Sequence, residues 1–364
     1  MRILLVGDAP TIHTRRWAEH FRDRGDAVMI SSFRPFKIPG VPVYTLPTYG
    51  LGKPGYFFGA PALAKLCRSF KPDIIHAHHI TSYGFIAALA GVKPLVLSAW
   101  GDDVLIDPYT SRLKRFFVRY AVKSADLVTT VAEHMNKGIF DLHVNGFTEG
   151  VTEVPAITFG VNLELFSLAA PRSRPDDPVR LICIRHLEPL YDIGTLIRAH
   201  ALARKAGMKL RTTLIGEGWQ RDELENLCRE LGVANEISFL GRVPHPTLPG
   251  RLQDADIFVS PALSDGNNVS LTEAMACGCF PIATEIPANT QWIEHGKNGY
   301  LYPASDAQAL ADCIVKAAAD SALLASALAE NRAIVEERAN WHKCVRQMDE
   351  LYARVLNGEG QPKK

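Results

Sequence analysis

The sequence predicts an α/β protein of two similar domains in tandem, each a parallel sheet with helices on both faces. Two observations lead to this prediction. Short apolar runs alternate with longer segments of helical periodicity along the chain, which is typical of strands that are buried on both faces. The alternation stops at a polar segment with three prolines, 168–178, and then starts again. A chain of 364 residues has the length expected for two domains.

The first half begins with a strand and a helix whose ends the sequence marks. The run RILLVG is followed by HTRRWAEHFRDRG, which places Trp17 and Phe21 on one helical face before Gly25 ends the helix. A segment rich in Pro and Gly, 34–55, is interpreted as a loop, and a helix is expected around 60–70. The predicted strands of this half are 2–7, 27–32, 72–79, 94–101 and 127–132.

The second half repeats the pattern, with predicted strands at 179–185, 210–218, 237–241, 257–261 and 280–284. A long final helix is expected over 334–356, because apolar residues recur there near the helical period. Right-handed crossovers bring the carboxyl ends of each set of parallel strands to one edge of its sheet. If the two edges face each other, the cleft between the domains is the natural binding site.

Composition and charge exclude several classes of protein. The net charge of +1 argues against a general binder of nucleic acid. Up to Phe166 the chain has 18 Lys and Arg against 14 Asp and Glu, and the remainder has 22 against 25, so only the first half is mildly basic. The seven cysteines show no metal-ligand spacing. The first apolar run is too short for a signal peptide or a membrane span, so we expect a cytoplasmic protein.

The segment 264–278, SDGNNVSLTEAMACG, combines two acids with a helix start. The helix ends at Gly278 and begins near Asn267 to Ser270. Backbone N–H groups and the helix dipole at such a start favour an anion, and Asp265 and Glu273 flank it. From spacing alone, an ordinary turn that leads into a helix is the simpler interpretation.

The wider sequence favours the other interpretation, because SDGNNVSLTEAMACGCFPIAT resembles the donor-site signature of the retaining glycosyltransferases of family four, the group 1 transferases. In that family, a glutamate, seven residues and a second glutamate precede AMACG. The resemblance extends over nearly the whole chain, and it includes the segments 72–79, 127–135, 157–166, 214–243 and 295–303.

The resemblance implies a GT-B fold, in which two Rossmann-like domains face each other across a cleft and the last helix crosses back to the first domain. The acceptor domain would be 1–168 with the helix 341–357, and the nucleotide-sugar domain would be 169–340. The implied reaction is a retaining, metal-independent transfer of a hexose from a UDP- or GDP-sugar to a glycan or lipid-linked glycan, in the synthesis of cell-surface polysaccharide or glycoconjugate. No cofactor is implied, because the nucleotide sugar is a substrate.

The resemblance also implies roles for residues of the second half. Glu273 would bind the ribose, and Asp265 stands where the family has a glutamate that contacts the transferred sugar, which makes Asp265 a candidate catalytic residue. Arg242 lies where the family holds the base, although a role in stabilising the turn is an equal alternative. Residues whose backbone would approach the donor are Gly216, Gly218, Gly266, Asn267, Asn268 and Val269.

The diphosphate clamp departs from the family pattern of Gly-Arg, four residues and Lys-Gly. Here Tyr191 takes the place of the lysine and His186 the place of the arginine, with Arg185 one residue earlier. Arg185 can still bind a phosphate through two N–H groups. We therefore predict Arg185 as catalytic and Tyr191 and His186 as donor-binding.

The first half supplies the predicted acceptor residues His13, Arg15, His79, Asp102 and Asp103, together with the candidate catalytic residue His78. Arg16 belongs to the same basic stretch as His13 and Arg15, and the alternative for that stretch is an exposed helix start. His78 and His79 end a predicted buried strand, at the edge that would line the cleft. The family's second glycine after Gly7 is absent.

Basic and aromatic residues alternate in 111–125. The part 111–123 is consistent with peripheral contact at the inner face of a membrane, and the alternative is a packed helix whose basic face is solvated. Two rival functions also remain. One is another GT-B chemistry, an inverting transferase or a sugar-nucleotide epimerase. The other is a non-catalytic protein that binds nucleotide sugar, which the missing lysine makes conceivable.

Overall fold

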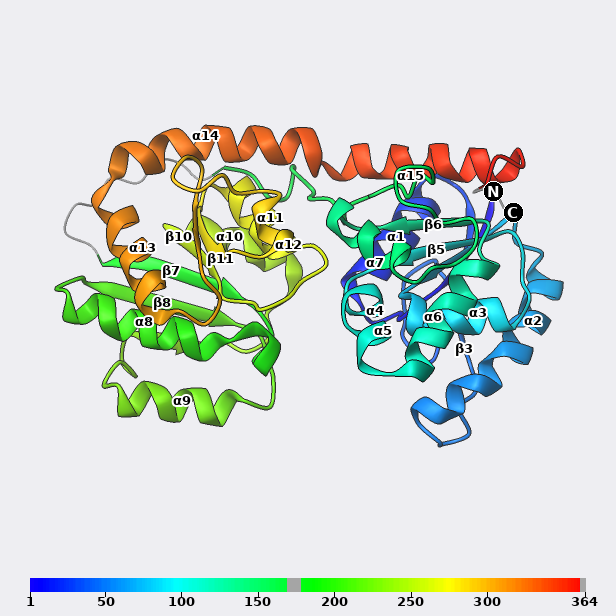
Figure 1. Ribbon diagram of the computed structural model, residues 1–364, viewed down its shortest axis with the longest axis horizontal. Helices are drawn as coiled ribbons and strands as arrows, with labels where there is room; N and C mark the ends of the chain where they lie inside the picture. Colours follow the sequence, from blue (N-terminus) through cyan, green and yellow to red (C-terminus); the bar gives the residue numbers. More distant parts are fainter. Residues whose placement is uncertain (169–177, 361–364) are drawn as a thin grey trace. The chain divides into compact units, whose positions relative to one another are not determined.

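The computed structural model describes residues 1–168 and 178–360. The chain divides into two compact units, Met1–Phe159 with Val345–Lys364, and Gly160–Cys344. Each unit contains one six-stranded parallel sheet between layers of helices (Figure 1). The predicted α/β class is therefore confirmed.

In the first unit the strand order is β3-β2-β1-β4-β5-β6. The strands are β1 (Arg2–Val6), β2 (Ala27–Ser32), β3 (Val43–Thr45), β4 (Ile74–His78), β5 (Leu95–Ala99) and β6 (Leu127–Thr130). The helices are α1 (Ile12–Asp23), η1 (Lys53–Phe58), α2 (Gly59–Phe70), η2 (Ile80–Gly84), α3 (Phe85–Leu89), α4 (Asp102–Leu105), α5 (Asp107–Thr110), α6 (Arg112–Ser124), η3 (Glu133–Met135), α7 (Asn136–Phe140) and, at the end of the chain, α15 (Trp341–Leu356).

In the second unit the strand order is β12-β11-β10-β7-β8-β9. The strands are β7 (Val179–Ile184), β8 (Leu210–Ile215), β9 (Ile237–Phe239), β10 (Ile257–Ser260), β11 (Phe280–Thr284) and β12 (Tyr300–Tyr302). The helices are η4 (Pro189–Tyr191), α8 (Ile193–Lys205), α9 (Arg221–Glu230), η5 (His245–Thr247), α10 (Leu248–Gln253), α11 (Val269–Cys277), α12 (Pro287–Thr290), α13 (Ala307–Ala319) and α14 (Ser321–Arg338).

The two sheets have the same topology. When the strands are counted from one within each unit, both read 3-2-1-4-5-6. The chain therefore reverses its direction of travel across the sheet between β1 and β4 in the first unit, and between β7 and β10 in the second. In sheets of this kind, ligands bind beyond the carboxyl ends of the strands at this switch point.

Alternate residues of the second sheet enter two separate cores. Leu181 and Val259 pack with α8 and α13 on one face, whereas Ile182 and Phe258 pack with α10 and α11 on the other. This is why the strand sequences are apolar at consecutive positions instead of alternate ones.

Two predictions about elements were wrong, and one strand was not predicted. The loop expected over 34–55 contains the short strand β3. The strand β12 lies in 295–303, for which no strand was predicted. The helix expected over 334–356 is two helices, because α14 ends at Arg338 and α15 begins at Trp341. The break occurs where the N–H of Val161 donates to the carbonyl of Ala339 at 2.6 Å and the N–H of Trp341 donates to the carbonyl of Val161 at 3.0 Å.

The apolar stripe predicted for the last helix is confirmed. Its members are all buried: Trp341, Cys344, Val345, Met348, Leu351, Tyr352 and Val355. From Val345 onward the helix belongs to the first unit. There Tyr352 lies 2.7 Å, hydroxyl to Nδ1, from His76 of β4, so α15 completes the core of that unit.

The units change at 159/160 and 344/345, whereas the sequence predicts divisions at 168/169 and 340/341. Val161 and Phe166 pack in a core of the second unit, which explains the earlier change. Most of the predicted linker, 168–178, lies outside the described residues. No helix of the described residues combines the length and the apolar character needed to cross a membrane.

Candidate functional site

The predicted residues follow the carboxyl ends of strands at the two switch points. In the second unit, Arg185 follows β7, and Asp265 lies in the loop between β10 and α11. In the first unit, His78 ends β4, and His13 lies in α1, which follows β1. Each unit therefore presents one group of polar residues where its topology favours a ligand.

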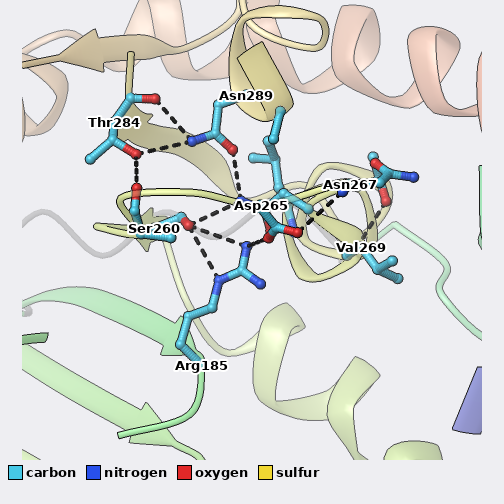
Figure 2. Close-up of polar contacts among 12 residues, drawn as sticks. Arg185, Ser260, Asp265, Asn267, Val269, Thr284 and Asn289 are labelled. Carbon is cyan, nitrogen blue, oxygen red and sulfur yellow. Dashed lines mark hydrogen bonds and ion pairs between the residues drawn. The ribbon is translucent and has the colours of Figure 1, made fainter. Parts of the chain in front are cut away.

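An ion pair joins the two strand ends in the second unit. Nη2 of Arg185 lies 2.9 Å from Oδ2 of Asp265, and only 10% and 17% of the two side chains are exposed. The guanidinium also lies 3.3 Å (Nη2) and 3.4 Å (Nε) from Oγ of Ser260, the last residue of β10 (Figure 2). Arg185, Asp265 and Ser260 thus contact one another where β7 and β10 end.

A chain of hydrogen bonds fixes the start of α11 to this pair. Asn268 is the N-cap, and its side-chain oxygen accepts from the N–H of Leu271 at 3.0 Å. Its amide nitrogen donates to Ser260 at 3.0 Å and to the side-chain oxygen of Asn289 at 2.8 Å. Asn289 in turn donates to the carbonyl and the hydroxyl of Thr284 at 2.9 and 3.2 Å (Figure 2). Ser260, Asn268, Thr284 and Asn289 are fully buried.

The loop before α11 is closed by its own acid. Oδ1 of Asp265 accepts from the N–H of Asn267 at 3.1 Å. Gly266 and Asn267 are buried, and Val269 is half-buried. Within the described residues, the N–H groups of Gly266 and Ser270 have no acceptor. These groups, together with the helix dipole of α11, make its N-terminus attractive to an anion.

Glu273 lies in the second turn of α11 and is buried. Its Oε1 is 2.7 Å from Nε2 of His245, the first residue of η5. The ring of His245 packs on Phe166, with ring centroids 5.3 Å apart. Sequence reasoning missed His245, because a single histidine in the stretch RVPHPT matches no pattern. It also missed Ser260 and Asn289, which only the fold brings to the loop.

The predicted glycines Gly216 and Gly218 lie against the protein's own backbone. A Cβ atom on Gly216 would lie 1.9 Å from the carbonyl oxygen of Arg185, and one on Gly218 would lie 2.1 Å from that of Leu187. Both glycines are therefore required by the packing of the β8 exit beside the β7 exit. This contact explains them without a ligand and holds the backbone of Arg185 in place.

The other predicted donor residues lie around Arg185. The guanidinium carbon is 5.7 Å from the ring centroid of Tyr191, and Tyr191 and His186 have ring centroids 5.9 Å apart. His186 is exposed, and its Nδ1 is 3.3 Å from the carbonyl oxygen of Glu217. Arg242 is exposed just after Gly241. Tyr191 thus contacts the cation of Arg185 through its ring.

In the first unit, His78 and His13 belong to one aromatic cluster with Trp100 and Phe159. Ring centroids are 4.8 Å apart for His78 and Trp100, 5.8 Å for His13 and Trp100, and 3.9 Å for His13 and Phe159. His78 is 1% exposed. Its Nδ1 lies 3.4 Å from the hydroxyl of Thr14, whereas its Nε2 has no partner within the described residues.

Burial lowers the pKa of His78 well below its ordinary value, and the nearby His76 adds to the effect. His78 is therefore neutral at physiological pH. Arg15 is directed elsewhere, since its guanidinium carbon lies 5.2 Å from the ring centroid of Phe36.

His79 and Asp102 form a second ion pair, with Nε2 and Oδ1 3.0 Å apart. Burial alone would lower the pKa of His79, but the negative charges of Asp103, Asp102 and Asp107 outweigh it and raise the pKa to about 9. The hydrogen bond to His79 lowers the pKa of Asp102. Asp102 is exposed, so this pair can meet a ligand.

The prediction that Asp103 binds an acceptor is not supported. Asp103 is fully buried, and its oxygens accept from the N–H groups of Ile80, Gly101 and Trp100 at 2.7, 2.9 and 3.0 Å. Its carboxylate holds the two strand-end loops together. Burial raises the pKa of this carboxyl group.

Among the residues that the structure describes, one group could bring three ligand atoms to a metal ion: His79, Asp102 and Asp107. Protein cations already balance both acids, because Asp102 pairs with His79 and Asp107 lies 2.5 Å from Nζ of Lys114. We therefore interpret the group as an ion-pair network.

The chain is similar to solved structures over almost its whole length. The chain superposes on Anabaena HepE in complex with UDP and glucose with a TM-score of 0.80, at 20% identity, over 97% of this chain and 99% of that one. Sucrose-phosphate synthase from Thermosynechococcus elongatus gives 0.83 at 18% identity, over 98% and 100%. The fold is the two-domain α/β GT-B fold.

Family models agree over most of the chain. The model "Glycosyl transferases group 1" matches residues 168–343, and "Glycosyl transferase 4-like" matches residues 2–132. The chain belongs to the group 1 glycosyltransferases and is an enzyme of that family.

Characterised relatives carry several activities. The amylovoran biosynthesis glycosyltransferase AmsK of Erwinia amylovora is 29% identical over 202 residues, 54% of this chain and 49% of that protein. The match thus spans about half of AmsK. N-acetyl-alpha-D-glucosaminyl L-malate synthase of Bacillus anthracis is 24% identical over 327 residues, 87% of this chain and 82% of that protein.

Proposed function

We propose that the protein is a retaining, metal-independent glycosyltransferase that moves a hexose from a UDP- or GDP-sugar to a hydroxyl of a glycan or lipid-linked glycan. The observation that carries the proposal is the buried pair of Arg185 and Asp265 beside the N-terminus of α11, at the switch point of the second sheet. This arrangement suits a ligand with a diphosphate next to a sugar.

Arg185 would offset the charge of the departing diphosphate. Its guanidinium is held by Asp265 and Ser260, so it is oriented before the donor binds and needs little rearrangement during transfer. The N–H groups of Gly266 and Ser270 would donate further hydrogen bonds to the phosphates. The dipole of α11 would also stabilise their negative charge. Tyr191 stands in the place of the family's lysine. Its ring would hold the guanidinium of Arg185 in position, but it would add no positive charge.

Asp265 would hold a hydroxyl of the transferred sugar and offset positive charge at its anomeric carbon. Glu273, fixed by His245, would accept hydrogen bonds from the ribose, and Arg242 would lie beside the base. In the first unit, His78 would bond to a sugar hydroxyl as a neutral group, which requires its buried Nε2 to be uncovered when the donor binds. His13 and the pair of His79 and Asp102 would contact the acceptor.

The relatives suggest where to begin. HepE was solved with UDP and glucose, which supports UDP-glucose as the first donor to test. AmsK is an amylovoran biosynthesis enzyme, which supports a role in cell-surface polysaccharide synthesis. We propose a cytoplasmic enzyme that reaches a lipid-linked acceptor at the inner face of a membrane through 111–123.

The experiment is a panel of nucleotide sugars, with release of nucleoside diphosphate measured with and without EDTA. Turnover of one donor that EDTA leaves unchanged is expected. The anomeric configuration of the product, determined by NMR, separates retention from inversion, and an isomerised donor would indicate an epimerase. A protein that binds a nucleotide but releases no diphosphate from any donor would be a binding protein, and the proposal would fail.

A further inference from the structure

Large exposed apolar side chains are concentrated in two segments of the first unit. They are Tyr49, Leu51, Phe57 and Phe58 around η1, and Leu113, Phe116 and Tyr120 on α6. We call these seven residues the aromatic face. Tyr49 is 73% exposed and Leu113 is 61% exposed, which is unusual for side chains of this size that face only water.

Ring contacts join the two segments. Phe117 of α6 packs against Phe57 and Phe85, with ring centroids 5.8 and 4.2 Å apart. On one side of this junction, Phe116 lies 6.2 Å from both Phe117 and Tyr120. On the other side, Phe58 lies 5.2 Å from Tyr49. The half-buried Phe117 thus links η1 and α6 into one surface.

The sequence around this surface contains few acids. There is no Asp or Glu in 27–72 or in 108–125. The same two ranges contain eleven basic residues: Arg34, Lys37, Lys53, Lys65, Arg68, Lys71, Arg112, Lys114, Arg115, Arg119 and Lys123. Asp107, one residue before the second range, pairs with Lys114 of α6, so acids are not absent from this region, but cations outnumber them. A surface with aromatic rings beside an excess of cations is complementary to an anionic partner that also accepts apolar groups.

The cations and rings of α6 share one side of the helix. Arg112, Phe116, Arg119 and Lys123 are spaced at four, three and four residues, so they form one stripe, and all four are exposed. Arg119 also donates to the carbonyl of Leu142. Arg112 and Lys123 flank Phe116 at the two ends of the stripe.

We propose that the aromatic face binds the surface of a lipid bilayer that contains anionic lipid. The rings would lie at the level of the headgroups, and Arg112 and Lys123 would lie against lipid phosphates. The membrane contact proposed for 111–123 is thereby extended to η1, and residues of both segments form the binding surface. A second copy of the chain fits less well, because a symmetric contact would bring two basic surfaces together.

The proposal rests on the proposed function only for its purpose, which is to bring the enzyme to a lipid-linked acceptor. Vesicle binding tests the surface by itself. If the protein binds vesicles but turns over no nucleotide sugar, the proposed function fails and the surface stands. If it turns over a donor but binds no vesicles, the surface is wrong and the function stands.

The experiment is co-sedimentation of the full chain with vesicles of phosphatidylcholine alone and of phosphatidylcholine mixed with phosphatidylglycerol. Binding is expected only to the mixed vesicles, and it should weaken as salt is raised. Combining Arg112→Glu with Lys123→Glu should lower the vesicle affinity by about tenfold or more. Combining Leu113→Ser with Phe116→Ser should remove binding even at low salt.

Two matched controls lie in the second unit. Trp219→Ser changes an aromatic residue that is 73% exposed, and Arg251→Glu reverses an exposed charge of α10. Both should bind vesicles as the wild type does, and circular dichroism checks that each variant is folded. The proposal is overturned if the wild type binds neither vesicle, or if the face and control variants behave alike. It is also overturned if the wild type is a dimer that Phe116→Ser dissociates and that ignores vesicles.

Discussion

Arg185 and Asp265 neutralise each other at the edge of the second sheet, with 2.9 Å between Nη2 and Oδ2. Each side chain is mostly buried, so removal of either one leaves the other without its charged partner at a position with little access to solvent. Under the proposed function, a diphosphate in this site would compete with Asp265 for the guanidinium. The pair would then couple the position of the phosphates to that of the acid.

Arg185→Ala is expected to lower kcat/KM for the active donor by about a hundredfold or more, since a charged donor to the leaving group is lost. Arg185→Lys should recover only part of the loss, because an ammonium cannot make two parallel hydrogen bonds. Steady-state release of nucleoside diphosphate measures both. Arg198→Ala, at an exposed position of α8, is the control. Wild-type kinetics in Arg185→Ala would reject the assignment.

Asp265→Ala is expected to slow the transfer step and to change nucleotide affinity little. The acid is proposed to act on the sugar, where charge develops only during the reaction. Single-turnover rates at saturating donor separate this from weaker binding. If the variant loses nucleotide affinity and keeps its transfer rate, Asp265 acts mainly by holding Arg185.

Glu273→Gln is expected to weaken binding of the nucleoside diphosphate about tenfold or more, because a charged acceptor for the ribose hydroxyls is lost. His245→Ala should weaken it less, since Glu273 remains but loses its support at 2.7 Å. Isothermal titration calorimetry measures both affinities. Glu225→Gln, on α9, is the matched control and should bind normally. Equal affinities in all three variants would contradict the prediction.

Asn289→Ala is expected to lower the free energy of unfolding by about 1–3 kcal/mol, because the buried amide of Asn268 loses an acceptor. It should also lower kcat, since the loop before α11 is less firmly held. Denaturant titration and donor turnover measure the two effects. Thr290→Ala, at the exposed neighbouring position of α12, should change neither. A variant with full activity would show that the loop needs no such support.

The first unit is expected to lose stability as the pH rises from 6.5 to about 9. Burial opposes the charge of His79, but the nearby carboxylates raise its pKa from 6.5 to about 9. The folded state therefore holds a proton that the unfolded chain has lost, so this contribution is complete below pH 6.5 and disappears as the pH passes about 9. In Asp102→Asn, the loss should be smaller and occur at lower pH. Denaturant titrations across this range measure it, and identical profiles would refute it.

The strands and their parallel pairing follow from features that are local in the sequence. Apolar runs such as 179–185 are strands because both faces of each sheet are covered, and crossover helices leave only parallel pairing. The strand β3, at three residues, is too short to show periodicity among prolines and glycines. The break at 339–340 is fixed by Val161, which is distant in sequence. Sequence reasoning also missed a local signal, since Asn340 caps the start of α15, where its side-chain oxygen accepts from the N–H of His342 at 2.9 Å.

The candidate site shows the same division. The residues Asp265 and Glu273 are recognisable because they lie in one continuous segment with a helix start. Their partners Arg185 and His245 come from other loops, so the contacts depend on the fold. Asp103 shows the opposite kind of error. The sequence places this acid next to a strand end and so suggests a ligand-binding group, whereas in the structure its oxygens accept from backbone N–H groups.

The position of α15 bears on how the protein is made. The second unit, Gly160–Cys344, is a continuous stretch, so all its parts are available once that stretch has left the ribosome. The first unit is translated earlier, but it lacks α15 until the last residues emerge, and until then the groups that meet Tyr352, including His76, are uncovered. Although domains made first generally fold first, the half of this chain that is synthesised first is completed last.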